Sequence, residues 1–288
     1  MIPRFSLARP RTLDEAWEAF ARTGGDGAWI AGGTELLQVM KMGLGRFGTL
    51  IDLKSIDDLR GIAIDDAGWL RIGATTTHRE IERSPVVHDS LPALAGLETR
   101  VANIRVRNTG TLGGNLAFAE PHSDPATFLL ACDAELELRG PNGSRTVHVG
   151  EFVVGPLLTA REPDEVIVAI GIPPRAPGEG RGYGKIAFFE RPAASVGVRV
   201  RIQDGAIGEA VITAGSLTDI PQVVPAAGVA LVGAAVADLD GALDGAAVAM
   251  GELEAVADLN GSADFKRHLA GRLLRRATRE AIGEAAGA

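Results

Sequence analysis

Two short glycine-containing runs carry the residue types best suited to hold a charged ligand. Residues 29–36 read Trp-Ile-Ala-Gly-Gly-Thr-Glu-Leu, and residues 111–124 read Thr-Leu-Gly-Gly-Asn-Leu-Ala-Phe-Ala-Glu-Pro-His-Ser-Asp. Glycine lets a backbone come close to a ligand because no Cβ stands in the way. Successive free N–H groups in such a turn form a concave seat for an anion. The two runs therefore predict a site for a polar, phosphorylated, sugar-bearing ligand.

The elements around the first run are those that commonly hold a pyrophosphate. Residues 29–31 predict a short buried strand, Gly32 and Gly33 predict a turn, and Thr34 is placed to cap a helix over residues 36–42. A strand, a glycine turn and a helix N-terminus together present N–H groups and a positive dipole end to phosphate. One Gly-Gly turn alone is more often structural, whereas two runs with matching neighbours favour one shared site.

Composition limits the classes of function that fit. The chain has 288 residues, of which 46% are hydrophobic, and a net charge of −8. An acidic chain of this kind is not expected to bind nucleic acid. It lacks an apolar stretch of about 18 residues and an N-terminal signal core, so we expect no membrane span and a cytoplasmic location. Cys132 is the single cysteine, and we expect it to be buried and inert.

The two runs together resemble the FAD-binding subunit of molybdenum hydroxylases. That family includes the medium subunits of carbon monoxide dehydrogenases and the flavin domain of xanthine dehydrogenases. The resemblance covers nearly the whole chain, through residues 31–37, 51–53, 111–124, 129–138, 151–159 and 183–191. It implies an α+β fold, with a two-subdomain FAD-binding domain of the vanillyl-alcohol-oxidase (PCMH) type and a smaller α+β C-terminal domain. We expect FAD-binding subdomains at 1–55 and 56–175, and the C-terminal domain at 181–288.

Sequence patterns predict the elements within these units. A helix is expected over residues 12–22, where Thr12 is the cap and Glu15 follows three residues later. Strands are expected at 49–53, 70–74 and 165–172, hairpins at 134–138 with 145–149 and at 196–203 with 208–213, and a linker at 173–180. Residues 264–282 predict a basic amphipathic helix with Lys266 on its polar side. A solvated face or a docking surface would both explain that helix.

The resemblance implies which residues contact FAD. The pyrophosphate would lie against Trp29, Ile30, Ala31, Gly32, Gly33, Thr34, Glu35 and Leu36. The phosphates and ribityl chain would lie over Thr111, Leu112, Gly113, Gly114 and Asn115. Asp124 would accept hydrogen bonds from cofactor hydroxyls, Val101 would contact the cofactor, and Leu157 or Leu158 would pack near the ring system. Tyr183 would stack on or near the ring, and Lys185 would stabilise its reduced, anionic form. Without the resemblance, Tyr183 and Lys185 are plain strand-surface residues.

The resemblance also implies partners. FAD would be held on this chain, molybdopterin on a large partner subunit, and 2Fe-2S clusters on a small one, in a dimer of heterotrimers. One cysteine cannot hold an iron–sulfur cluster, which needs about four ligands. The chain would then be an oxidoreductase subunit that passes electrons from those clusters to a quinone, NAD or dioxygen. The alternatives are a stand-alone FAD-dependent oxidase or reductase of the same superfamily, and a non-enzymatic protein that uses the fold as a scaffold.

Other motifs give no competing chemistry. Residues 43–48 match G-x-G-x-x-G, but a helix precedes and a strand follows them, which is the reverse of a dinucleotide-binding turn. The five histidines lack metal-ligand spacing, so we expect no protein-bound metal. His122 lies inside the second run, where a local hydrogen bond or a catalytic role would explain it. No side-chain catalytic residue is predicted, which favours a cofactor that carries the chemistry.

Overall fold

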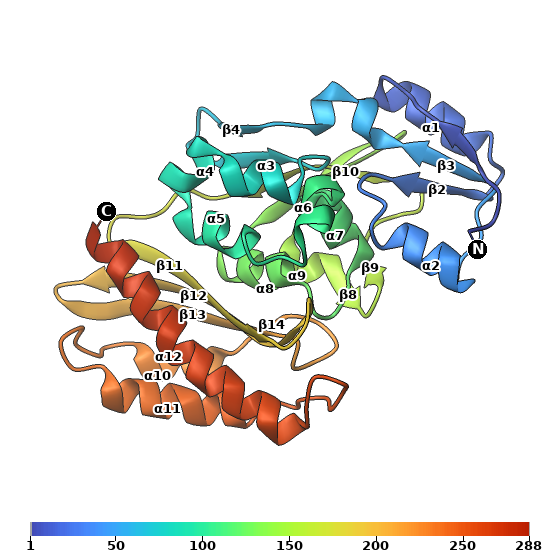
Figure 1. The fold of residues 1–288 in the computed structure, drawn as a ribbon. Coiled ribbons are helices and arrows are strands. Elements are labelled where there is room, and N and C mark those ends of the chain that lie inside the picture. The colour runs from blue at the N-terminus through green and yellow to red at the C-terminus, as the bar shows by residue number, and fades with distance from the viewer. Residues whose placement is uncertain (1, 288) are drawn as a thin grey trace.

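The structure is a computed structural model that describes residues 2–287, and three main sheets follow one another along the chain (Figure 1). The first sheet is parallel, in the order β1-β3-β2, and its strands are β1 (Ser6–Ala8), β2 (Gly27–Ile30) and β3 (Thr49–Asp52). Two helices connect these strands, α1 (Leu13–Ala21) and α2 (Leu36–Met42). The predicted cap is confirmed, because the Thr12 hydroxyl accepts a hydrogen bond from the Glu15 amide at 3.2 Å.

The second sheet has five strands with antiparallel pairing, in the order β4-β5-β10-β6-β7. Short 3-10 turns at Leu53–Ser55 and Asp57–Leu59 lead into it. Its strands are β4 (Ile62–Ile64), β5 (Leu70–Gly73), β6 (Glu135–Gly140), β7 (Gly143–His148) and β10 (Val166–Ile172). The predicted strand at 70–74 and the first predicted hairpin are confirmed. The strands β8 (Val153–Gly155) and β9 (Leu158–Thr159) form a separate two-stranded antiparallel sheet.

Seven short helices accompany the second sheet within residues 2–287. They are α3 (His78–Arg83), α4 (Pro85–Ser90), α5 (Pro92–Glu98), α6 (Ile104–Thr109), α7 (Leu112–Phe118), α8 (Asp124–Ala131) and α9 (Val149–Phe152). Side-chain caps begin several of them, and α3 has a full capping box between Thr77 and Glu80. Their buried apolar residues share one core with the sheet, in which Phe128, Leu129 and Ile170 are fully enclosed.

The third sheet is antiparallel, in the order β11-β12-β13-β14. Its strands are β11 (Glu179–Ala187), β12 (Pro192–Gln203), β13 (Ala206–Gly215) and β14 (Gln222–Val223). The helices α10 (Pro225–Leu231), α11 (Asp240–Gly251) and α12 (Ala263–Gly287) pack with it in the lower part of Figure 1. We call residues 179–287 the C-terminal unit.

The long helix α12 corrects one expectation. Its apolar side packs on β11 and β12, but Lys266 is 1% exposed rather than solvated. Phe265, expected on the apolar side, is 40% exposed. None of the helices within residues 2–287 has both the length and the apolar character needed to span a membrane.

The mixed helix-and-sheet architecture agrees with the predicted α+β class. The three-unit division at 1–55, 56–175 and 181–288 stays a prediction, and Met1 and Ala288 lie outside the described residues.

Candidate functional site

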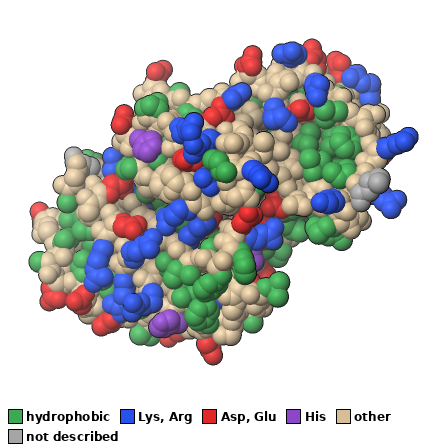
Figure 2. Space-filling view, in the orientation of Figure 1, with side chains coloured by type: hydrophobic (Ala, Val, Ile, Leu, Met, Phe, Trp, Pro, Cys, Tyr) green, Lys and Arg blue, Asp and Glu red, His purple; other side chains and the backbone are tan. Residues whose placement is uncertain are grey.

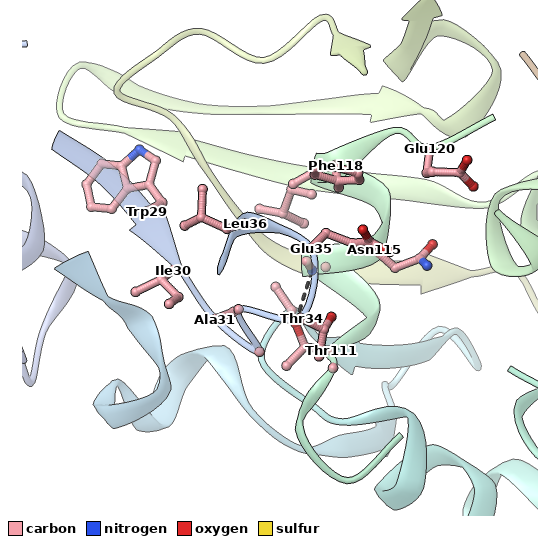
Figure 3. Close-up of a pocket in the computed structure, with 18 of the residues that line it drawn as sticks. Trp29, Ile30, Ala31, Thr34, Glu35, Leu36, Thr111, Asn115, Phe118 and Glu120 are labelled. Atoms are coloured by element: carbon pink, nitrogen blue, oxygen red, sulfur yellow. Dashed lines mark hydrogen bonds between the residues drawn. The ribbon is translucent and has the colours of Figure 1, made fainter. Parts of the chain in front are cut away.

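A cleft of about 450 Å³ lies where the first and second sheets meet, and both glycine-containing runs line it (Figure 3). The loop at 31–36 forms one wall, and the start of α7 forms the other. The first run lies directly against the residues that precede the second run. A Cβ on Gly32 would lie 2.3 Å from the carbonyl oxygen of Thr109 and 2.6 Å from the Cα of Gly110. The absence of a side chain at Gly32 thus allows the two walls to meet at the base of the cleft.

The backbone of the first run has a geometry that can accept an anion. Gly33 has φ +71°, a left-handed conformation that glycine adopts without strain. Within residues 2–287, the N–H groups of Gly32, Gly33, Thr34 and Glu35 donate to no protein acceptor. Successive N–H groups of this kind can bind phosphate oxygens. The predicted cap is wrong, because Glu35, not Thr34, occupies the N-cap position of α2, and no side chain bonds there.

The second run differs from the expected loop. It is the first turn of α7, and its N–H groups are already paired. Leu112 donates to Thr76 O at 3.1 Å, Gly113 to Ala74 O at 3.0 Å and Gly114 to the Thr111 hydroxyl at 3.1 Å. The expectation of free N–H groups is therefore wrong for this run, because a cap and a neighbouring strand end satisfy them.

The two adjacent glycines of that turn have different surroundings. A Cβ on Gly113 would lie 2.6 Å from the Cβ of Ala74, so this residue lets α7 pack on the end of β5. A Cβ on Gly114 would lie 2.8 Å from its own capping hydroxyl on Thr111 and 3.9 Å from Ala31 across the cleft. Gly114, not Gly113, therefore faces the space between the two runs.

Side chains at the two ends of the cleft suit an amphipathic ligand. Trp29 stacks on Phe20 with ring centroids 4.4 Å apart, and its indole N–H donates to Pro163 O at 2.9 Å. Phe118 lines the other wall, as Figure 3 shows. The Ser123 hydroxyl donates to the Asn115 side-chain oxygen at 2.5 Å, which leaves the Asn115 amide nitrogen available to a ligand.

Asp124 lies in a buried polar cluster beside the cleft. Its carboxylate accepts from the Tyr183 hydroxyl at 2.5 Å and from the Lys185 Nζ at 2.7 Å, and Lys185 also donates to Arg100 O at 2.6 Å. Burial raises the pKa of Asp124, although the Lys185 cation opposes that rise. Burial likewise raises the pKa of Tyr183 well above its ordinary value.

The structure separates the predicted site residues into two groups. The cleft lining includes Val101, Asp124 and all of the first run, together with Thr111, Gly113, Gly114 and Asn115. It does not include Leu112, Leu157, Leu158, Tyr183 or Lys185. Leu112 is buried in the core, whereas Leu157 and Leu158 are 58% and 59% exposed outside the cleft.

The ring of Tyr183 does not face the cleft, which contradicts its expected stacking role. It is 2% exposed, packs edge-on against Phe128 at 5.9 Å, and has the Arg100 guanidinium over its face at 5.7 Å. The expectation that Tyr183 and Lys185 are surface residues is wrong as well, because Tyr183 is buried and the side chain of Lys185 is only 8% exposed beside Asp124.

The sequence predicted no binding role for several of the lining residues. Arg161 and Pro163 approach Trp29 from more than 130 positions along the chain, and Arg191 and Glu120 lie at the rim. His78, also in the lining, hydrogen bonds through Nδ1 to Glu98 at 2.7 Å. These residues carry no local sequence signal, since their partners are set by the tertiary fold.

Two family models match the chain. Residues 3–175 match the FAD binding domain in molybdopterin dehydrogenase, and residues 190–281 match the CO dehydrogenase flavoprotein C-terminal domain. The carbon monoxide dehydrogenase medium chain of Hydrogenophaga pseudoflava is 34% identical over 279 residues, 96% of each chain. The nicotine 6-hydroxylase medium subunit of Paenarthrobacter nicotinovorans is 31% identical over 97% of this chain and 98% of its own.

Solved structures of related proteins are similar to this chain over nearly its whole length. The carbon monoxide dehydrogenase of Hydrogenophaga pseudoflava contains a chain that superposes with a TM-score of 0.93, 33% identity and 99% coverage of both chains. Quinoline 2-oxidoreductase from Pseudomonas putida 86 contains one with a TM-score of 0.92, 29% identity and the same coverage. The similarity therefore extends through all three sheets.

Proposed function

Because this chain belongs to the family of FAD-binding medium subunits of molybdenum hydroxylases, we propose that FAD binds in the cleft between residues 31–36 and α7. The chain is thus an oxidoreductase subunit that transfers electrons within a heteromeric enzyme. Its relatives are named as medium chains or subunits, which favours this role over a stand-alone oxidase or a scaffold.

The observation that carries the site assignment is the row of N–H groups from Gly32 to Glu35, which have no protein acceptor in the described part of the chain and lie opposite Gly114. A diphosphate offers the acceptor oxygens that these donors need. Gly114 leaves room for it, because a side chain there would enter the same space. The Asn115 amide can donate to a ribityl hydroxyl from the adjacent turn.

The chain's own residues bind and orient the cofactor. When bound, FAD supplies redox chemistry that joins one-electron donors to two-electron acceptors. With FAD in this cleft, the apolar surfaces of Trp29 and Phe118 would shield it from water, and the buried Lys185–Asp124 pair would hold the start of α8 at the cleft. Tyr183 and Lys185 lie outside the cleft lining, so they would act on FAD only through the Asp124 carboxylate to which both donate.

The assembly we propose is a dimer of heterotrimers in the cytoplasm. A large partner would carry molybdopterin, and a small partner would carry the 2Fe-2S clusters that deliver electrons to this chain. Co-expression of the chain with the two neighbouring subunit genes, followed by mass measurement of the purified complex, tests that composition. A complex that lacks molybdenum or iron would contradict it.

Substitution of Gly114 by valine tests the FAD site. Gly114→Val would place a branched side chain between Thr111 and Ala31, where the diphosphate is proposed to lie. We expect FAD affinity to fall at least about tenfold, or ~1.4 kcal/mol. Bound FAD is measured from the visible spectrum of the purified chain, together with titration of the FAD-free protein.

A helical glycine away from the cleft serves as the matched control. No atom lies within 4 Å of a Cβ built on Gly96 in α5. Gly96→Ala is therefore expected to keep the full FAD content and to gain about 0.4–1 kcal/mol of stability. If folded Gly114→Val binds FAD as tightly as the Gly96→Ala control, the site assignment is wrong.

A further inference from the structure

A chain of charged side chains joins the cleft to the C-terminal unit, and His122 is its central member. His122 Nδ1 bonds to Glu120 Oε1 at 2.9 Å, and Nε2 bonds to Asp258 Oδ2 at 2.9 Å. Glu120 and His122 line the cleft, whereas Asp258 lies in the loop that leads into α12. One imidazole ring therefore connects the residues that follow α7 with a segment 136 positions away.

The residues at both ends of this row of charged side chains make further contacts. Lys266 of α12 donates to Asp258 Oδ2 at 2.7 Å and to Ser216 O at 3.0 Å, and its side chain is 1% exposed. At the other end, Arg191 lies 3.4 Å from Glu120 and 3.5 Å from Glu35 of the first run. Three cations thus alternate with three carboxylates from one cleft wall to α12. In Figure 2, acidic and basic side chains lie together where the two lobes of the molecule join.

The geometry requires both ring nitrogens of His122 to donate. Each nitrogen faces a carboxylate oxygen, and a carboxylate can only accept. Only the imidazolium donates from both nitrogens, whereas neutral imidazole has one N–H. Loss of the ring proton would break one of the two bonds and leave two carboxylates with one cation fewer between them.

The electrostatic environment agrees with that requirement. The hydrogen bond to Glu120 raises the pKa of His122, burial opposes the rise, and Asp258 adds to it. Burial disfavours the charged form of Asp258, but the bonds from Lys266 and His122 lower its pKa to about 2. For Glu120, burial is likewise outweighed by the bond from His122 and by the charges of His122 and Arg191, so its pKa is lowered.

We infer that His122 is a positioning residue that holds the rim of the FAD cleft against the C-terminal unit. As an imidazolium, His122 donates one hydrogen bond to Glu120 at the rim and one to Asp258 in the loop before α12. This inference rests on the proposed function. FAD affinity should depend on Asp258, a residue outside the cleft lining, and on the protonation of His122.

The test is the dissociation constant of FAD for the full chain, stripped of cofactor and titrated with FAD from pH 6 to pH 9. A cation with a raised pKa keeps its bonds below its ordinary value of 6.5 and loses them as the pH rises through the folded pKa. We expect the dissociation constant of the unmodified chain to rise about three- to tenfold across this range. His122→Phe, which has a ring but no donor, should bind weakly at every pH.

Two further variants distinguish positioning from a general loss of stability. Asp258→Asn should also weaken FAD binding at pH 6 and flatten the pH profile, although Asp258 does not line the cleft. His148→Phe is the matched control. His148 in β7 lies 3.6 Å from Asp133 and 3.5 Å from Glu135, but outside the cleft. Its FAD affinity and pH profile should equal those of the unmodified chain.

The outcomes separate the two proposals. If the unmodified chain binds no FAD at any pH, both the proposed function and the inference are wrong. If it binds FAD but His122→Phe and Asp258→Asn bind equally well with the same pH profile, only the inference is overturned. A lower melting temperature in these variants, with FAD affinity unchanged, would also overturn it, because the network would then be merely structural.

Discussion

Single residues beside the cleft show how burial determines what an ion pair contributes to the stability of the fold. The side chains of Lys185 and Asp124 are 8% and 5% exposed and bond at 2.7 Å. Their removal from water is costly, and their mutual contact together with Tyr183 and Arg100 compensates for it. Removing one partner leaves the other charge buried without compensation.

Lys185→Met should therefore be strongly destabilising. We expect a loss of about 3–5 kcal/mol in the free energy of unfolding, measured by urea denaturation without FAD. The double variant Lys185→Met with Asp124→Asn should recover much of that loss, since no unpaired charge remains. Lys54→Met is the control. Lys54 pairs with Asp52 at 2.9 Å but is 46% exposed, so at most about 1 kcal/mol is expected. Equal losses in the two single variants would contradict this account.

The burial of Cys132 could be predicted from the sequence, whereas the orientation of Tyr183 could not. Cys132 was expected to be inert, and it is fully buried with burial raising its thiol pKa to about 12. Composition around it was enough for that prediction. The orientation of Tyr183 was not predictable, because its hydroxyl partner lies 59 positions away and its ring contacts come from α8 and Arg100.

At the scale of elements, the contact of β11 with α12 depends on glycine. A Cβ on Gly180 would lie 1.9 Å from Ala281 O, and one on Gly182 would lie 2.1 Å from Ala277 O. The helix backbone rests directly on the strand at these points. The basic residues of α12 lie away from this contact, and Arg275 and Arg279 pair with Asp244 and Asp240 of α11.

Gly182→Ala should push α12 away from the sheet. The added methyl meets backbone rather than a movable side chain, so we expect a loss of about 1–3 kcal/mol by urea denaturation. Gly241→Ala in α11 is the control, because nothing lies within 4 Å of its Cβ position. That variant should be neutral or slightly stabilising. If Gly182→Ala unfolds at the same urea concentration as Gly241→Ala, the close approach does not matter for stability.

Elements with strong local signals were predictable, and those defined by distant contacts were not. The cap at Thr12 correctly placed α1, and the apolar segment at 165–172 correctly placed β10, which is buried along nearly all of its length. The second glycine run was mistaken for an open loop. Its helical form depends on Thr111 as the cap and on Ala74, from the end of β5, as the acceptor for Gly113. Two adjacent glycines disfavour a helix locally, so tertiary contacts decided the outcome.

At the scale of the whole molecule, α8 joins the cleft to the C-terminal unit. Asp124 begins this helix at the cleft, and Thr127, one turn later, lies against the third sheet. Thr213 donates to Thr127 O at 2.8 Å, and a Cβ on Gly215 would lie 1.9 Å from the Thr127 hydroxyl. Such close packing, together with the network through His122, favours unfolding of the three sheets as one cooperative unit.

FAD should then stabilise the entire chain rather than the cleft alone. A ligand that binds only the native state at 100 times its dissociation constant adds about 2.7 kcal/mol. For a chain of this size, that corresponds to a rise of about 5–10 °C in the melting temperature. Circular dichroism at increasing FAD concentration should show one transition that moves as a whole, and Gly114→Val should show a smaller shift at each FAD concentration. A second transition that FAD leaves in place would mean that the C-terminal unit unfolds independently of the cleft.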